Sequence, residues 1–343
     1  MKALVLEEYK KLVVKEVDKP EIAKNEVLIR VKAVSICGSD VHGYDGTSGR
    51  RLPPVIMGHE ASGIIEEKGS EVSGYDIGDR VVFNSAFYCG HCIFCLQGKQ
   101  NLCVDYKVFG VSTEDFNLPG AMAEFVKVPA HLLFHLPDNI PFDQAALIEP
   151  MSIALHSINR VRLNLNDTAV IFGSGTIGMM VLKLLALSSV GKIIIVDIDD
   201  EKLESAKQNG ADFIVNSAKS NVKQAISEIT GNKGADVVFE AVGIPPTLSG
   251  AVECLRKGGT VVLLGNLSKT VEMPMQQVVV RELNIKGSNL CTTEYNDSIS
   301  LLETGKIRVD DMISHTCVLE DGPAMFDRLH TSPAGMKKVV MLL

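Results

Sequence analysis

The chain has 343 residues, of which 46% are hydrophobic and 22% charged, and its formal net charge is −8. That length is enough for two domains that each bury a core. The acidic balance argues against a nucleic-acid partner, because binding to a phosphate backbone requires a basic face. No uninterrupted apolar run approaches the roughly 20 residues of a membrane span, and no signal-peptide core precedes Glu7. We therefore expect a cytoplasmic protein with neither a nucleic-acid nor a membrane partner.

Residues 1 to about 150 read as short strands and turns. Two apolar, β-branched runs, 27–36 and 61–69, predict strands. Gly, Pro and Asp cluster between them, at 43–54, which is typical of turns.

Three separate segments of this half carry side chains that could hold a metal. They are Cys37, Ser39 and His42 in CGSDVH, His59 and Glu60 in GHEASG, and Glu149 in IEPMSIALH. A thiolate, an imidazole and carboxylates can bind zinc and leave one position for water or an alcohol. Each also has a plain structural explanation, such as a small buried cysteine, a core histidine or a helix-start glutamate. Spacing along the sequence does not decide whether these segments meet.

Four of the eight cysteines lie in a loop-like stretch at about 85–105, with the spacing C-x2-C-x2-C-x7-C. They are Cys89, Cys92, Cys95 and Cys103. Four thiolates can close a tetrahedron around zinc and leave no position for a substrate, so this metal is expected to be structural. Disulfides are the alternative, but a large chain with a full core and no secretion signal seldom needs them.

From about residue 168 strands alternate with helices. Apolar runs predict strands at 168–172, 192–197, 211–215, 235–242, 260–265 and 282–287, with helices from the glycine loop to about 189 and over 199–210. Continuous apolar strands alternating with helices are buried on both faces, which predicts an α/β domain with a parallel, doubly wound sheet. After about residue 290 the alternation stops, and the chain ends with a strand-like run at 337–343.

A glycine-rich loop opens the α/β region. GSGTIG contains Gly173, Gly175, Thr176, Ile177 and Gly178, and it lies between the first strand and the first helix. This placement is typical of a dinucleotide site, in which the glycines allow a tight turn, close approach of a pyrophosphate and helix–strand packing. A plain βαβ turn remains the alternative.

The next strand ends in an acidic residue that favours one dinucleotide. Asp197 stands nineteen residues after Gly178 and would accept hydrogen bonds from ribose hydroxyls. Asp199 and Asp200 follow with no arginine nearby, so a 2′-phosphate would be repelled. NAD is therefore expected rather than NADP.

The motifs CGSDVH, GHEASG, the four-cysteine segment, IEPMSIALH and GSGTIG occur in this order along the chain. Together they resemble the medium-chain, zinc-dependent alcohol and polyol dehydrogenases. The resemblance is nearest to the branch of sorbitol (L-iditol) and galactitol-1-phosphate 5-dehydrogenases. It implies a mainly β GroES-like catalytic domain at 1–150, a Rossmann NAD domain at 151–289, and a return to the first domain at 290–343. The active site would lie in the cleft, and the protein would be a homodimer or homotetramer.

Residue roles follow from the resemblance. Cys37 and His59 match catalytic zinc ligands, Glu60 a position that ligates in some polyol enzymes, and Glu149 one that ligates directly or through water. Ser39 and His42 match a relay that removes a proton, and the four clustered cysteines match a structural zinc lobe. Each chain would thus hold two zinc ions, and hydride would pass from an alcohol carbon to the nicotinamide.

The sequence indicates the class of reaction more closely than it indicates the substrate. Charged ligands should make zinc a weak Lewis acid, which a polyol could offset by chelation, so we expect a secondary alcohol flanked by other hydroxyls. Arg50 and Arg51 either bind the phosphate of a sugar-alcohol phosphate or are solvated loop residues. L-threonine 3-dehydrogenase and a non-catalytic NAD-binding scaffold are the alternative functions.

Overall fold

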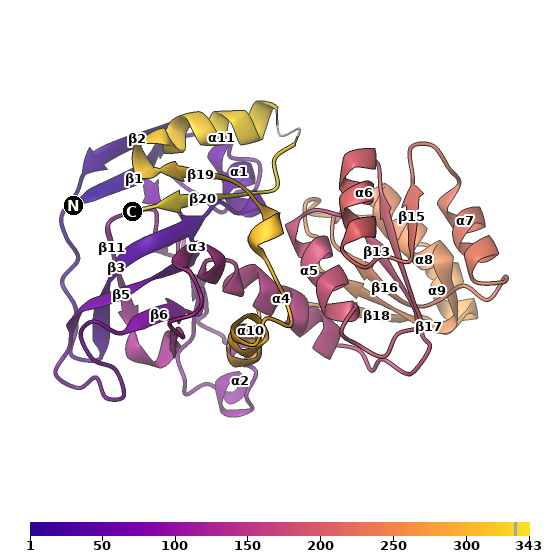
Figure 1. The fold of residues 1–343 in the computed structure, drawn as a ribbon, viewed down its shortest axis with the longest axis horizontal. Helices are drawn as coiled ribbons and strands as arrows, with labels where there is room; N and C mark the ends of the chain where they lie inside the picture. Colours follow the sequence, from indigo (N-terminus) through magenta and orange to yellow (C-terminus); the bar gives the residue numbers. More distant parts are fainter. Residues whose placement is uncertain (333–334) are drawn as a thin grey trace. The chain divides into compact units, whose positions relative to one another are not determined.

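The computed structural model describes residues 1–332 and 335–343. These residues form two units, which Figure 1 draws as ribbons. Unit 1 comprises Met1–Glu149 and Thr292–Leu343, and unit 2 comprises Pro150–Cys291. Among the described residues, none of the helices combines the length and apolar character that a membrane crossing demands.

Unit 1 is built on a mainly antiparallel sheet in the order β12-β6-β5-β3-β20-β19, with β11 also paired to β3. Its central strand has buried residues on both faces, because the side chains of Val27, Ile29 and Val31 join the core on one face while Leu28 is covered on the other. The strands are β3 (Glu26–Ser35), β5 (Glu60–Lys68), β6 (Arg80–Phe83), β11 (Phe125–Pro129), β12 (Leu133–His135), β19 (Ile313–Val318) and β20 (Lys338–Leu342).

Shorter elements surround this sheet. β1 pairs with β2 and β4, β7 with β8, and β9 with β10. Their bounds are β1 (Lys2–Glu8), β2 (Lys11–Glu16), β4 (Val55–Ile56), β7 (Ala86–Phe87), β8 (Lys107–Val108), β9 (Val111–Ser112) and β10 (Asn117–Leu118). The helices are α1 (Gly38–Tyr44), α2 (Ile93–Leu96), α3 (Phe142–Ala145), α10 (Glu294–Glu303) and α11 (Gly322–Thr331), and α4 (Ile148–Asn159) begins at the end of the unit's first segment.

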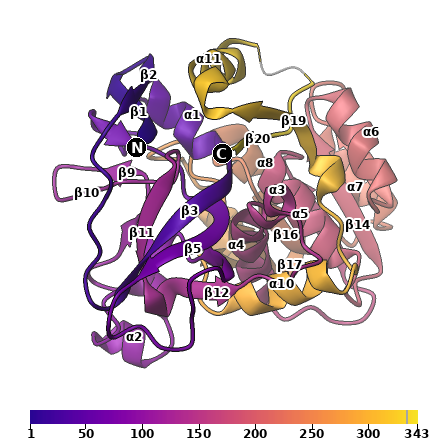
Figure 2. The same ribbon diagram turned by 60° about the vertical axis from the view of Figure 1, so that its left-hand side comes forward.

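The C-terminal strand returns to the beginning of the chain. β20 is antiparallel to β3, with Val340 opposite Ser35, and it is parallel to β19. Figure 2 shows the yellow β20 beside the indigo β3. The strand-like run predicted at 337–343 therefore completes the sheet of unit 1.

Unit 2 is a parallel sheet in the order β15-β14-β13-β16-β17-β18, with α5 and α6 on one face and α7, α8 and α9 on the other (Figure 1). The order runs outward in both directions from β13, which confirms the predicted doubly wound sheet. The strands are β13 (Thr168–Phe172), β14 (Lys192–Asp197), β15 (Phe213–Asn216), β16 (Ala235–Glu240), β17 (Leu255–Leu263) and β18 (Asn284–Gly287). The helices are α5 (Thr176–Leu185), α6 (Asp200–Gln208), α7 (Val222–Ile229), α8 (Pro245–Cys254) and α9 (Met275–Val280).

The predicted elements of unit 2 are all present, and their ends differ by a few residues. β17 starts five residues before the predicted run, because Leu255 pairs with Ala235 across a register shift. β18 starts at Asn284 rather than at Glu282, whose backbone has a φ of +50° and so belongs to a turn.

Candidate active site

The ends of three paired strands in unit 1 bring together residues that are far apart in the sequence. Ser35, the last residue of β3, stands opposite Glu60 of β5 and opposite Val340 of β20. Cys37 follows β3 by two residues, His59 precedes β5, and Lys338 begins β20. Because these three neighbouring strands are paired in this register, the side chains meet where the strands end or begin, on one end of the sheet.

Cys37, His59 and Glu60 each present a ligand atom, and these atoms lie within 4.8 Å of one another. His59 and Glu60 are buried, and Cys37 is half-buried. Nδ1 of His59 faces the carboxylate of Asp40, which leaves Nε2 as the nitrogen that a metal could use. A thiolate, an imidazole and a carboxylate at these distances fit a zinc ion with one position left open.

Glu60 is paired with a buried lysine. Its Oε2 accepts hydrogen bonds from Nζ of Lys338 and from the hydroxyl of Ser35. Nζ of Lys338 also donates to the carbonyl of Ile36 at 3.1 Å. Burial alone would lower the pKa of Lys338, but the charge of Glu60 outweighs it and raises that pKa, so Lys338 is protonated.

Asp40 lies behind His59, on α1. It is completely buried, and its Oδ1 is 3.5 Å from Nδ1 of His59 and 2.8 Å from Nη2 of Arg51. Burial would raise the pKa of Asp40, but the charges of His59 and Arg51 outweigh that effect and hold the pKa well below its usual range. An ionised carboxylate next to a metal-binding histidine selects the tautomer and orients the ring.

Glu149 lies near this cluster but is not one of its members. It is buried at the start of α4, and its Oε1 accepts a hydrogen bond of 2.7 Å from the hydroxyl of Ser85. Burial, together with the charge of Glu60, raises the pKa of Glu149 to about 7, against the opposing charge of His59. Glu149 is not among the residues whose ligand atoms lie within 4.8 Å of one another.

The two residues predicted as a proton relay are on α1, immediately after Cys37. Both side chains are exposed. The hydroxyl of Ser39 lies 3.4 Å from Nη2 of Arg51, and the backbone carbonyl of His42 accepts hydrogen bonds from Thr47 and Ser48.

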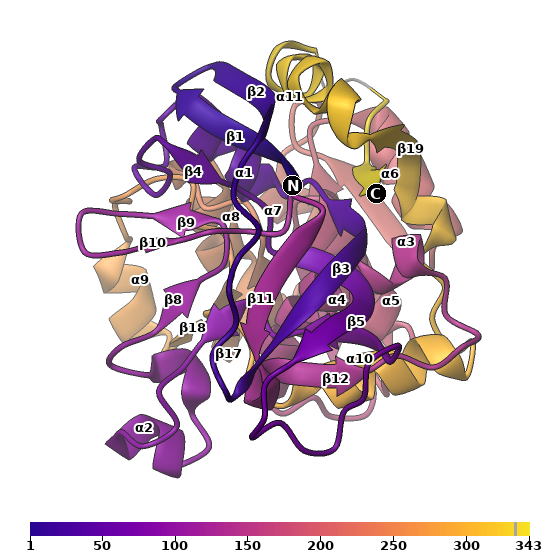
Figure 3. The same cartoon turned by 90° about the vertical axis from the view of Figure 1, so that its left-hand side faces the viewer.

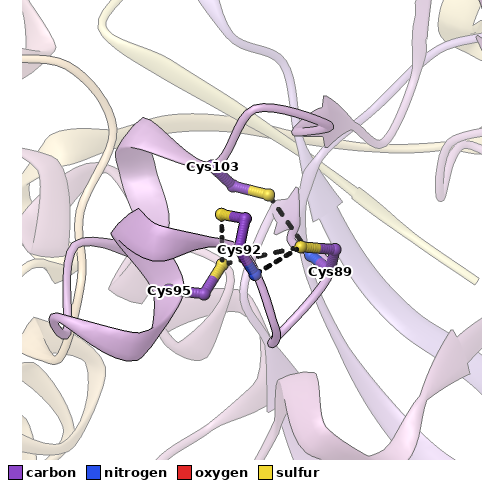
Figure 4. Close-up of side chains that lie close together, drawn as sticks. All are labelled: Cys89, Cys92, Cys95 and Cys103. Carbon is purple, nitrogen blue, oxygen red and sulfur yellow. Dashed lines mark hydrogen bonds between the residues drawn. The ribbon is translucent and has the colours of Figure 1, made fainter.

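The four clustered cysteines gather in one place, as Figure 4 shows. We call residues 89–103 the cysteine lobe, which projects from the strands of unit 1 (Figure 3). The sulfur of Cys95 lies 3.5 Å from that of Cys92 and 4.0 Å from that of Cys89. Around a tetrahedron with the usual Zn–S distance of about 2.3 Å, sulfurs stand roughly 3.8 Å apart, so the lobe fits zinc. None of these cysteines forms a disulfide in the described residues.

Replacing Cys95 with serine should remove the lobe metal. We expect the zinc content to fall by one ion per chain, and the unfolding temperature to fall by roughly 5–10 °C for a loss of about 2–3 kcal/mol. Zinc analysis and thermal unfolding would measure both effects. An unchanged zinc content would contradict the structural-metal assignment.

The glycine loop of unit 2 has the geometry that a dinucleotide requires. Gly173 has a φ of +94°, and a side chain at Gly178 would place its Cβ 1.8 Å from the carbonyl oxygen of Gly173. Nothing lies within 4 Å of a Cβ at Gly175, the N-cap of α5. The first and third glycines therefore serve the turn and its packing, and the second leaves room at the helix N-terminus for an anion. Thr176 and Ile177 form the first turn of α5.

Asp197 ends β14 beside this loop. Its Oδ2 accepts hydrogen bonds from the backbone N–H of Ser174 at 2.7 Å and from its hydroxyl at 2.6 Å. Its Oδ1 accepts from the N–H groups of Ile198 and Asp199. Burial would raise the pKa of Asp197, but the bonds from Ser174 outweigh it and lower that pKa. Asp197 therefore ties the glycine loop to the neighbouring strand.

This lowered pKa predicts a loss of stability in acid. A carboxyl group whose folded pKa lies below its unfolded value of about 3.9 stabilises the fold above that pH, and the contribution disappears as the pH falls through the folded pKa. The difference in unfolding free energy between wild type and Asp197→Asn should therefore shrink from pH 5 to pH 3. Urea denaturation would measure it. Asp138→Asn, at a side chain that is 99% exposed, is the control variant.

Comparison with known proteins places both units in one family. The family model described as "Alcohol dehydrogenase GroES-like domain" matches residues 23–138, and that described as "Zinc-binding dehydrogenase" matches residues 176–304. An "Uncharacterized zinc-type alcohol dehydrogenase-like protein" of Haemophilus influenzae is 37% identical over 341 residues, 99% of this chain and 98% of its own length. Sorbitol dehydrogenase of Bacillus subtilis is 32% identical, over 96% of this chain and 93% of its own.

The chain belongs to the zinc-dependent medium-chain alcohol and polyol dehydrogenases. Their combination of a Rossmann domain with a GroES-like domain is thereby confirmed for this chain. Galactitol-1-phosphate dehydrogenase from Escherichia coli superposes with a TM-score of 0.93 at 27% identity, over 100% of both chains. L-threonine 3-dehydrogenase of Alteromonas mediterranea is 32% identical over 99% of both chains. Membership establishes a zinc-containing alcohol or polyol dehydrogenase and leaves the substrate open.

The structure of this dehydrogenase corrects one interpretation of the sequence. Arg51 is neither a solvated loop residue nor available to a phosphate, because it is 3% exposed and its guanidinium is paired with Asp40. Arg50, the preceding residue, is exposed. Of these two arginines, Arg50 is therefore the one that remains available to a phosphate group.

Sequence reasoning also missed residues that support the site of this dehydrogenase. Asp40 lies inside the CGSDVH motif but was not singled out, and Lys338 lies in the strand-like C-terminal run. A lysine at the start of an otherwise apolar strand was a usable signal, since lysine is almost never fully buried unless paired. Nothing in the sequence indicated that Lys338 pairs with Glu60.

Proposed function

We propose that this protein is an NAD-dependent polyol dehydrogenase. It would transfer hydride from a secondary alcohol of a polyol or sugar alcohol to NAD⁺ and release a ketose. The observation that carries the proposal is the convergence of Cys37, His59 and Glu60 within 4.8 Å, on a chain that belongs to a family with sorbitol dehydrogenases.

Cys37, His59 and Glu60 would hold the catalytic zinc, and Glu149 would act on it through a water molecule. When bound, the zinc would supply Lewis-acid chemistry at an alcohol oxygen. With Cys37 as a thiolate and one or two carboxylates as further ligands, the zinc would be a weaker Lewis acid than one with neutral ligands. A polyol suits such a site because a second hydroxyl can add to the binding of the first.

Ser39 and His42 would carry the proton away from the alcohol. Both side chains are exposed on α1, directly after Cys37, so a proton received there can reach water. Histidine suits this role because its pKa lies near neutrality. Since Ser39 also lies near Arg51, its hydroxyl is held on one side of the helix.

Unit 2 would bind NAD rather than NADP. Gly173, Gly175 and Gly178 leave space for a pyrophosphate at the start of α5, and Asp197 lies at the end of the next strand. Asp199 caps α6, so its carboxylate adds negative charge where a 2′-phosphate would stand. We assign residues 1–150 and 290–343 to the catalytic domain and residues 151–289 to the NAD domain.

The decisive experiment is a screen of NAD⁺ and NADP⁺ reduction over free polyols, their phosphates, simple secondary alcohols and L-threonine. We expect the highest kcat/KM with NAD⁺ and a polyol or polyol phosphate. Highest activity with L-threonine would replace the proposal with threonine 3-dehydrogenase. No turnover on any compound, together with a single zinc ion per chain, would favour the non-catalytic scaffold.

The phosphate question has a matched pair of substrates. If Arg50 contacts a phosphate group, Arg50→Gln should reduce kcat/KM for a polyol phosphate and leave the value for the free polyol unchanged. Equal preference for the free polyol in wild type and variant would exclude a phosphate-binding role.

A further inference from the structure

Arg51 is buried although it belongs to a Gly- and Pro-rich loop. Only 3% of it is exposed, whereas the adjacent Arg50 is exposed. Its aliphatic stem crosses α1 at Gly43, where a Cβ would stand 2.1 Å from Cγ of Arg51. Helix α1 thus has a glycine where the side chain of Arg51 crosses it, and a larger residue at that position would clash with the arginine. Arg51 therefore packs into a space that α1 leaves open for it.

The guanidinium reaches the residues behind the proposed metal site. Nη2 donates to Oδ1 of Asp40 at 2.8 Å and lies 3.4 Å from the hydroxyl of Ser39, while Nη1 donates to the carbonyl of Arg50 at 3.0 Å. Asp40 in turn faces Nδ1 of His59 with the same Oδ1.

Asp40 links two of the proposed ligands. Its Oδ1 faces His59, and its Oδ2 accepts a hydrogen bond of 3.3 Å from the backbone N–H of Cys37. Because Asp40 is completely buried, hydrogen bonds from the protein hold its carboxylate in place. Arg51 donates one of 2.8 Å, and His59 is the group that the carboxylate then faces.

We propose that Arg51 is a positioning residue of the metal site, which fixes the carboxylate of Asp40 by hydrogen bonding so that Asp40 orients His59 toward the ion. The inference deepens the proposed function and rests on its metal site. A lysine would supply the charge without the fixed fork of N–H groups that here contacts Asp40 and Arg50 together.

The first test measures zinc affinity rather than turnover. Arg51→Met, Arg51→Lys and the matched control Arg50→Met are compared by competition with a chelator, and zinc retained in the cysteine lobe serves as the internal reference. We expect Arg51→Met to lower the zinc affinity of the site formed by Cys37, His59 and Glu60 about 10- to 100-fold, as loss of groups that orient metal ligands does. Arg51→Lys should lie between it and wild type, and Arg50→Met should match wild type.

The second test asks whether Arg51 acts through Asp40. Asp40→Asn should weaken zinc binding by a similar factor, and the double variant Arg51→Met/Asp40→Asn should bind zinc no more weakly than Asp40→Asn alone. Cobalt substituted at the site should show an altered absorption spectrum in Arg51→Lys, a variant that retains the buried charge.

A merely structural role gives a different pattern. In that case the Arg51 variants unfold at a lower temperature while the folded protein retains the wild-type zinc affinity and cobalt spectrum, and the proposal is overturned. Additive effects of Arg51→Met and Asp40→Asn would overturn it as well. These readouts need no substrate, so failure of the polyol screen would leave them intact and the two results can be told apart.

Discussion

Replacing Cys37 with serine is expected to reduce kcat/KM by roughly 1000-fold, which corresponds to about 4 kcal/mol of lost transition-state stabilisation. Cys37 is one of the three residues whose ligand atoms lie within 4.8 Å, and a serine hydroxyl does not offer the charge of a thiolate. The zinc content should fall from two ions per chain to one. Steady-state kinetics and metal analysis would measure the two effects on the same preparation.

The chain offers a matched control for this substitution. Cys317 is half-buried on β19 and belongs to neither group of candidate ligands. Cys317→Ser should retain both zinc ions and keep kcat/KM within about twofold of wild type. A Cys37→Ser protein with two zinc ions and full turnover would contradict a catalytic role for this metal site.

Replacing Lys338 with methionine is expected to destabilise the protein by about 3–5 kcal/mol, because it leaves the buried carboxylate of Glu60 without its cation. Lys338 is 2% exposed and Glu60 is 1% exposed, so water cannot take over the charge. Urea denaturation after removal of the metal would measure the loss, since a bound cation would otherwise compensate for Glu60.

Two further variants make this expectation specific. Lys337→Met alters the adjacent, exposed lysine and should change stability by no more than about 0.5 kcal/mol. Lys338→Met/Glu60→Gln replaces the stranded charge with a neutral amide and should recover part of the loss. If Lys338→Met and Lys337→Met were equally mild, the buried ion pair would contribute nothing measurable.

Features that depend on neighbouring residues could be predicted from the sequence. The cysteine lobe spans fifteen positions from Cys89 to Cys103, so its spacing alone brings four sulfurs within reach of one ion. The glycine loop likewise lies within six residues, between a strand and a helix that were both predicted. In each case the geometry depends on neighbouring residues, so the residue types and their spacing are enough to predict it.

Features that depend on strand register could not be predicted in this way. Cys37, His59, Glu60 and Lys338 meet because Ser35 pairs with Glu60 on one side and with Val340 on the other, across separations of up to about 300 residues. A shift of one residue in either pairing would turn the side chains to the opposite face of the sheet. Packing of the whole sheet sets that register, and no local pattern encodes it.

The sequence by itself therefore determined the alternation of strands and helices in the second half of the chain, the cysteine lobe and the glycine loop, because short-range geometry specifies each of them. Only the tertiary structure decided that Lys338 neutralises Glu60 and that Arg51 lies against Asp40 rather than in solvent. The physical reason is that burial of a charged side chain depends on the partner it finds, and both partners come from other elements of unit 1.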